Sequence, residues 1–189
     1  GDSRHPLGRW KEAEEFYKKS IALNPLKPIT YMNLGNALTF EGRNEEAIPY
    51  FRKVLDLNPG HQRAHMYIGR NYILMGRPEL GLNEMKQENV EIFKKFGLTL
   101  AYSALGQEKN ADEMLKEFAD QYRDNWAYLL AQLFAFRGEK DAAFTWLEVA
   151  YSKRDSWLFW LNGDPLLKNL ESDPRHNALR KKMNIPLND

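Results

Sequence analysis

Two histidines are the residues of this chain best placed for metal chemistry. His61 and His65 lie four positions apart at the start of an expected helix, a spacing that can turn two imidazoles toward one metal ion. No third ligand is near them in the sequence, whereas zinc sites use three or four protein ligands. We therefore interpret His65 as a helix-packing residue and His61 as a turn residue, and we predict no metal site.

The acidic residues offer no pair suited to acid–base catalysis. Glu14–Glu15 and Glu45–Glu46 fall in first turns or on the expected solvent faces of helices, where carboxylates complement the helix dipole. The sequence also has no glycine-rich phosphate loop, no metalloprotease motif and no glycine-flanked nucleophilic serine. We therefore predict that the chain is not an enzyme and needs no cofactor.

The bulk composition excludes several kinds of partner. The 27 basic and 26 acidic residues leave a net charge of +1, without the basic excess that is typical of nucleic-acid binding. The basic cluster of Arg175, Arg180, Lys181 and Lys182 is interpreted as a solvated helix end rather than a nucleic-acid or lipid contact. No apolar run approaches the roughly 18 residues of a membrane span. The absence of cysteine excludes disulfides, and we expect a cytoplasmic protein.

A regular spacing of glycines reveals the elements that must position any binding residue. The gaps between five glycines are 34, 34, 30 and 32 residues, and the glycines are Gly8, Gly42, Gly76, Gly106 and Gly138. Each is followed five positions later by a small residue: Ala13, Ala47, Gly81, Ala111 and Ala143. A period in this range indicates stacked helix pairs, so we predict turns near residues 8, 42, 76, 106 and 138.

The second repeat shows the pattern most clearly. Its first helix carries residues at the spacing of one helical face, namely Tyr31, Leu34, Gly35 and Leu38. We expect Gly42 to be the left-handed residue after this helix and Asn44 to cap the next one. The second helix then carries Ala47 and Phe51, and Pro59 ends the repeat. We expect Gly35 to allow the two helices to approach closely opposite Ala47.

These residues resemble the tetratricopeptide repeat family. The family pattern W-x2-L-G-x2-Y, A-x3-F, P reads here as Tyr31-x2-Leu34-Gly35-x2-Leu38, Ala47-x3-Phe51, Pro59. The resemblance covers residue 8 to about residue 153. It implies an all-α fold, a right-handed superhelical solenoid of antiparallel helix pairs, in which the chain binds a protein or peptide partner.

The two ends of the chain differ from the repeats between them. Residues 10–23 are expected to be the second helix of a truncated first repeat, so we expect an excised segment of a longer protein. The apolar face of this helix would be exposed or would lie against a second molecule. At the other end, Asp164-Pro165 and Asp173-Pro174 predict the starts of two short capping helices. We therefore predict repeats over residues 1–153 and capping helices over 154–189.

The C-terminal tail resembles the end of repeat arrays in bacterial multidomain regulatory proteins. The matching phrases are Gly138-Glu139-Lys140, Asp164-Pro165-Leu166 and Ser172-Asp173-Pro174-Arg175. In such proteins the upstream part is a nucleotide cyclase, a winged-helix transcription factor or a protein kinase. The resemblance implies that this chain is the regulatory part of a larger protein.

In the tetratricopeptide repeat family, ligands usually meet the first helix of each repeat along a concave groove. The resemblance places eight partner-binding residues there: Met32, Asn36, Arg63, Met66, Arg70, Phe96, Tyr128 and Gln132. Methionines adapt to varied side chains, and Arg63 and Arg70 could pair with a carboxylate. The lysine, asparagine and arginine clamp of some family members is incomplete, because Tyr67 stands where a basic residue is required.

The predicted function is therefore a protein–protein interaction or scaffolding module that binds a peptide or partner surface in this groove. Two alternatives stay open. The chain could be a substrate-reading or regulatory accessory domain of an enzyme located upstream, such as a nucleotide cyclase or kinase. It could also be a homo-oligomerisation module that associates through the exposed N-terminal face.

Overall fold

The computed structural model describes residues 10–185, and this part of the chain contains helices and no strands. The helices are α1 (Trp10–Leu23), α2 (Pro28–Phe40), α3 (Asn44–Leu57), α4 (Ala64–Leu74), α5 (Pro78–Gln87), α6 (Glu91–Ala104), α7 (Glu108–Tyr122), α8 (Ala127–Phe136), α9 (Lys140–Ser152) and α10 (Pro174–Lys182). Two 3-10 helices, η2 (Ser156–Trp160) and η3 (Pro165–Leu170), precede α10. The all-α prediction is confirmed, and the turn predicted at Gly8 lies outside the described residues.

The chain forms two compact units, which we describe separately. The described part of the N-terminal unit runs from residue 10 to Leu115, and that of the C-terminal unit runs from Lys116 to residue 185. The division falls within α7. The boundary predicted near residue 153 lies between α9 and η2.

Tight turns with left-handed glycines join the helices of each pair. Gly42 has a φ of 77°. Its amide donates to the carbonyl oxygen of Thr39 over 3.0 Å, so the turn satisfies a carbonyl group in the last turn of α2. The same conformation recurs, as predicted, at Gly76, Gly106 and Gly138. The prediction for Asn44 is wrong: α3 begins at this residue, the N-cap is Arg43, and no side chain caps the helix.

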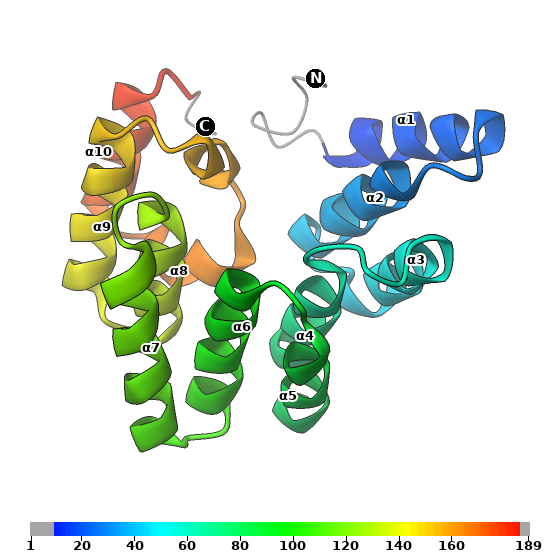
Figure 1. Ribbon diagram of the computed structural model, residues 1–189. Coiled ribbons are helices and arrows are strands. Elements are labelled where there is room, and N and C mark those ends of the chain that lie inside the picture. Colours follow the sequence, from blue (N-terminus) through cyan, green and yellow to red (C-terminus); the bar gives the residue numbers. More distant parts are fainter. Residues whose placement is uncertain (1–9, 186–189) are drawn as a thin grey trace. The chain divides into compact units, whose positions relative to one another are not determined.

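The helices of the α2–α3, α4–α5 and α8–α9 pairs lie side by side (Figure 1). In the α4–α5 pair, small residues face each other. A Cβ atom added to Gly69 on α4 would lie 2.9 Å from the backbone carbonyl oxygen of Gly81 on α5. Because a backbone atom cannot move aside as a side chain can, the α4–α5 contact requires glycine at position 69. In the α2–α3 pair, Ala47 is fully buried, but the residue that meets Gly35 is Phe51, whose ring would lie 2.7 Å from an added Cβ atom. The expected opposition of Gly35 and Ala47 is therefore wrong, because the aromatic ring fills the space that glycine leaves.

In the N-terminal unit, polar links between non-neighbouring segments reinforce the apolar core. The Arg43 guanidinium in the α2–α3 turn pairs with Glu14 of α1, and this contact lowers the pKa of the Glu14 carboxyl. Glu84 of α5 bonds both Arg52 of α3 and His65 of α4. Glu84 therefore ties three consecutive helices together, and only 7% of its side chain is exposed.

The C-terminal unit ends in three short helices, each started by an aspartate. Asp164 accepts a hydrogen bond from the Leu166 amide, and Asp173 accepts one from the Arg175 amide, so both predicted caps are confirmed. Hydrogen bonds from the side chain and backbone of Arg175 lower the pKa of Asp173 to about 2. Asp155 starts η2 in the same way. The segments η2, η3 and α10 pack on α8 or α9.

Candidate partner-binding surface

The predicted partner-binding residues lie on the first helices of the pairs or at a helix start. Their repeat positions are equivalent, either ten or six residues before a turn glycine, except for Arg63, which directly precedes α4. Ten residues before the glycine (position ten) stand Met32 on α2, Met66 on α4, Phe96 on α6 and Tyr128 on α8. Six residues before the glycine (position six) stand Asn36 on α2, Arg70 on α4 and Gln132 on α8. The repeat geometry therefore gives these residues a common register along the first helices.

In the N-terminal unit, the first helices contact one another directly. α2 packs on α4, and α4 packs on α6. The hydroxyl of Thr39 on α2 donates to the Asn71 carbonyl oxygen on α4 over 3.0 Å. The two residues at position six of these helices also meet: Nη2 of Arg70 lies 3.4 Å from Oδ1 of Asn36. The first helices therefore bring Asn36 and Arg70 together, although 34 residues separate them in the sequence.

Arg70 is a buried cation without a counter-ion. Its residue surface is 5% exposed, and it forms no ion pair with any residue between 10 and 185. Its guanidinium carbon lies 4.8 Å from the centre of the Tyr67 ring, and its buried Nε has no hydrogen-bond partner. A cation–π contact supplies part of the stabilisation that burial removes, but it leaves the Nε donor unsatisfied.

Arg63 differs from Arg70 in conformation and surroundings. It is half-buried and has a φ of 72°, a left-handed conformation that is uncommon for a residue other than glycine. Its guanidinium carbon lies 5.6 Å from the centre of the Phe93 ring on α6. Arg63 therefore extends from the start of α4 toward α6, away from the level of Asn36 and Arg70.

The apolar members of the predicted set are almost completely buried. Met32, Met66 and Phe96 are each 2% exposed or less. Side chains on a repeat face can be buried by intramolecular packing, so burial alone does not identify them as binding residues. The polar pair of Asn36 and Arg70 carries the more specific signal for a ligand.

In the C-terminal unit, the equivalent positions hold a carboxylate of the same chain. Asp164 is 2% exposed. Its Oδ2 accepts hydrogen bonds from the Tyr128 hydroxyl over 2.8 Å and from the Gln132 amide nitrogen over 2.6 Å. A partner that reached Tyr128 or Gln132 would have to displace this segment. Sequence reasoning identified Asp164 as a helix cap and missed its second role, because nothing in the sequence pairs it with α8.

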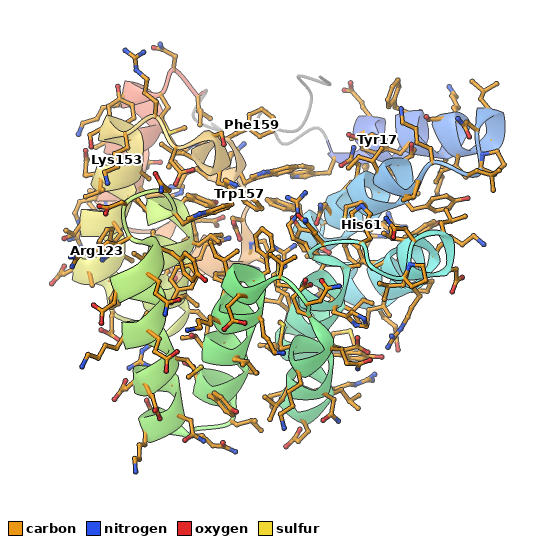
Figure 2. The ribbon with its side chains drawn as sticks, viewed as in Figure 1. Tyr17, His61, Arg123, Lys153, Trp157 and Phe159 are labelled. Atoms are coloured by element: carbon orange, nitrogen blue, oxygen red, sulfur yellow. The ribbon has the colours of Figure 1, made fainter. Side chains whose placement is uncertain are left out.

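The two histidines lie in different settings. His61 lies in the α3–α4 connection (Figure 2), and its Nδ1 is 2.8 Å from the carbonyl oxygen of Gln62. His65 lies on α4, and its Nδ1 is 2.8 Å from Oε2 of Glu84. Among the residues that the structure describes, no three or more His, Cys, Asp or Glu side chains are grouped to hold a metal ion.

The C-terminal unit also contains a pocket that sequence reasoning missed. It has a volume of about 360 Å³ and is lined by the α7–α8 and α9–η2 connections. Trp126 and Trp157 meet there with ring centres 5.8 Å apart, and Lys153 donates to the Asp124 carbonyl oxygen over 2.8 Å. Lys153 and Trp157 are labelled in Figure 2. Two loops that are far apart in the sequence form this pocket, so no local sequence motif predicts it.

Comparison with known proteins agrees with the arrangement of the helices. Paired helices stacked on their neighbours define a helical-repeat protein, the class that presents extended surfaces to partners. Residues 28–61, which span α2, α3 and the α2–α3 turn, match the tetratricopeptide repeat family. This segment of the chain is similar to one tetratricopeptide repeat. No curated protein sequence matches it. Over residues 10–185, every helix is too short or too polar to cross a membrane.

Proposed function

We propose that the chain is a protein-interaction module that binds a peptide segment of its partner on α2 and α4, next to α6. Tetratricopeptide repeats generally mediate protein–protein interaction or scaffolding. The observation that carries the proposal is the meeting of Asn36 and Arg70 at equivalent positions of two adjoining first helices. These side chains place polar groups beside the methionines of the same faces.

The mechanism depends on a surface that is already formed before the partner arrives. Helix pairs fix the backbone, so little ordering on the repeat side opposes binding. Met32 and Met66, each 2% exposed, fill the space behind this surface and keep its shape. Asn36 and Arg70 add hydrogen-bonding specificity. The partner therefore needs a segment with a polar side chain.

The proposal is tested by locating the binding surface on the full chain. Peptides would be selected from a random display library against the immobilised protein and then titrated into isotope-labelled protein. We expect amide NMR signals of α2 and α4 to shift, including those of Asn36 and Arg70, while the solvent-exposed Asn83 on α5 does not respond. Shifts confined to α3 and α5, or the selection of no binding peptide, would refute the proposal.

A second candidate function is self-association through the N-terminal helices. Large apolar side chains are exposed on α1, on the connection to α2 and in the first turn of α2: Phe16 at 44%, Leu23 at 89%, Leu26 at 74% and Ile29 at 41%. An exposed apolar cluster of this kind is typical of an interface. Sedimentation velocity should show a concentration-dependent dimer that is lost in Leu23→Lys plus Leu26→Lys. A monomer at all concentrations would exclude this function.

The resemblance of the C-terminal tail extends the main proposal to a regulatory role within a larger protein. The family is typically a non-catalytic interaction module, so we assign the chain binding rather than catalysis. An enzyme that uses this chain as an accessory domain would place its own chemistry in another domain. The sequence of the gene around this segment would decide that point.

A further inference from the structure

The turn after α9 differs from the equivalent turns of the other helix pairs in one residue. Arg154 lies there in the left-handed region, with a φ of 54°. Its amide donates to the carbonyl oxygen of Tyr151 over 3.1 Å, and the Asp155 amide donates to that of Ala150 over 2.9 Å. The turn after α8 has the same pair of hydrogen bonds, but its left-handed residue is Gly138. Glycine also holds this place after α2, α4 and α6, namely Gly42, Gly76 and Gly106.

An arginine in this conformation costs conformational energy that a glycine would not. At positive φ the Cβ atom is crowded against the backbone of its own residue. Asn184 stands at the corresponding place after α10, but asparagine tolerates this conformation better than most residues. Backbone strain is concentrated at functional sites, where the side chain has a use that offsets the cost. Arg154 combines such strain with a place in the lining of a pocket.

That pocket, in the C-terminal unit, has the size and the wall of a small-molecule site. Its volume of about 360 Å³ falls within the usual range of roughly 300–1,000 Å³. Trp126 and Trp157 line it together with Arg154. The two indole rings have centres 5.8 Å apart and planes inclined by 56°, and both residues are only partly buried. Indole rings favour contact with other aromatic rings, so this wall suits a planar aromatic ligand.

Hydrogen bonds between the two loops hold the pocket in shape before a ligand arrives. The Lys153 ammonium donates to the carbonyl oxygen of Asp124 over 2.8 Å. The Asp155 carboxylate accepts hydrogen bonds from the Tyr128 amide over 3.0 Å and from the Trp157 amide over 2.9 Å. A pocket that is already formed needs little ordering when a ligand binds.

The charges of the lining favour an anion over a cation. Each oxygen of Asp155 already accepts from a backbone amide, and Oδ1 of Asp124 lies 3.5 Å from Nζ of Lys153. The exposed side chain of Arg154 forms no ion pair or hydrogen bond with any residue that the structure describes. A cation in the pocket would meet Arg154 and Lys153 as like charges. A carboxylate or phosphate could accept paired hydrogen bonds from the planar guanidinium.

We propose that this pocket binds a small planar aromatic molecule that carries a carboxylate or a phosphate group. The ring contacts the indoles of Trp126 and Trp157, and the guanidinium of Arg154 donates to the anionic group. This contact accounts for an arginine at a turn position that favours glycine. The site lies in the C-terminal unit and goes beyond the proposed peptide surface on α2 and α4.

The test titrates charged aromatic probes and their neutral counterparts into the full chain by isothermal titration calorimetry. Indole-3-acetate is compared with indole-3-acetamide, and adenosine 5′-monophosphate with adenosine. We expect an anionic probe to bind and its neutral counterpart to bind roughly tenfold more weakly. The pair that shows this difference identifies the anionic group as carboxylate or phosphate. Failure of both anionic probes to bind at millimolar concentration, or equal binding within each pair, would overturn the proposal.

Substitution of Arg154 should change binding and stability in opposite directions. Arg154→Gly should weaken the anionic probe roughly tenfold, to the affinity of its neutral counterpart. Its thermal midpoint should rise by about 2 °C because the strain is relieved. Arg154→Asn, with the residue found after α10, should weaken binding equally. The control Arg123→Gln removes an exposed cation outside the lining and should leave binding unchanged. Unchanged affinity in Arg154→Gly, or an equal loss in Arg123→Gln, would overturn the proposal.

The indole N–H signals in NMR spectra locate the bound probe. Those of Trp126 and Trp157 should shift during the titration, whereas that of Trp10 in the N-terminal unit should not. Shifts confined to the other tryptophans would place the ligand elsewhere and contradict the assignment. Because no selected peptide enters this experiment, its failure would leave the proposed surface on α2 and α4 untouched.

Discussion

Gln132 on α8 and Arg70 on α4 share a repeat position but differ in the groups that satisfy their side chains. On α8, the neutral side chains of Tyr128 and Gln132 hold Asp164 of their own chain. On α4, the charged side chain of Arg70 is buried and has no carboxylate among residues 10–185. The repeat geometry fixes the place of the side chain, whereas the segments packed around it determine whether a ligand is already present.

The comparison separates a buried polar group with partners from one without a counter-ion. A buried carboxylate with several donors contributes to stability, and its removal leaves those donors unsatisfied. A buried guanidinium without a counter-ion lowers stability, and its cation–π contact compensates only part of that cost. The same position of the repeat should therefore respond in opposite ways to the removal of its polar group in the two units.

The largest effect is expected from removal of the carboxylate on the α8 side. Asp164→Ala deletes the cap of η3 and leaves the Tyr128 hydroxyl and the Gln132 amide without their acceptor. We expect the free energy of unfolding to fall by about 4 kcal/mol, measured by urea denaturation with circular dichroism. The exposed control Asp141→Ala should cost less than about 0.5 kcal/mol. Equal small effects of both variants would contradict the assigned role of Asp164.

A smaller loss is expected when only one donor to Asp164 is removed. Tyr128→Phe keeps the ring and deletes the hydroxyl that lies 2.8 Å from Oδ2 of Asp164. We expect a cost of about 1–2 kcal/mol in the same denaturation experiment. Tyr151→Phe is the matched control, because its hydroxyl makes an exposed contact with the Lys182 carbonyl oxygen. If the control loses as much stability as Tyr128→Phe, burial does not strengthen the Asp164 contact.

On the α4 side, the opposite sign is expected in the absence of a partner. Arg70→Met replaces a buried, unpaired cation by an apolar chain of similar length. We expect the free energy of unfolding to rise by about 1 kcal/mol, since apolar replacements of buried charges are often neutral or stabilising. The loss of the contact with Tyr67 reduces this gain. Destabilisation by several kcal/mol would make Arg70 a structural residue like Asp164 and remove the contrast.

The smallest effect is a pH dependence of stability that arises from His176 in the C-terminal unit. Burial and the nearby charge of Arg180 lower the pKa of His176 below its usual 6.5, and Asp173 opposes this weakly. The unfolded chain then binds the proton first, so stability is highest above about pH 6.5 and falls as the pH decreases through that value. The free energy of unfolding of the wild type should fall between pH 7.5 and 5.5. We expect His176→Leu to reduce this fall by about 1 kcal/mol or less.

The control for this pH dependence is His61→Asn, which changes the histidine in the α3–α4 connection. This variant should lose stability with falling pH as the wild type does, as followed by urea midpoints at each pH. An unchanged pH profile in His176→Leu would show that another group is responsible.

Local sequence signals predicted most of the helical elements. The glycine spacing gave the turns at Gly42, Gly76, Gly106 and Gly138, because a helix ended by a left-handed residue favours glycine. Aspartate followed by proline located the starts of η3 and α10, since a cap and a fixed φ act within one turn. The cap at Asn44 was wrong because a helix boundary shifts by one residue when no side chain fixes it.

The candidate site was predictable only as a set of positions. The repeat period assigns Asn36, Arg70 and Gln132 to equivalent places because helical geometry is local and periodic. The meeting of Arg70 with Asn36, and of Gln132 with Asp164, joins residues more than 30 positions apart. Such contacts depend on how helices pack and on where a later segment returns. The sequence therefore determined the repeat and its register, whereas tertiary packing decided which of these positions already holds a carboxylate.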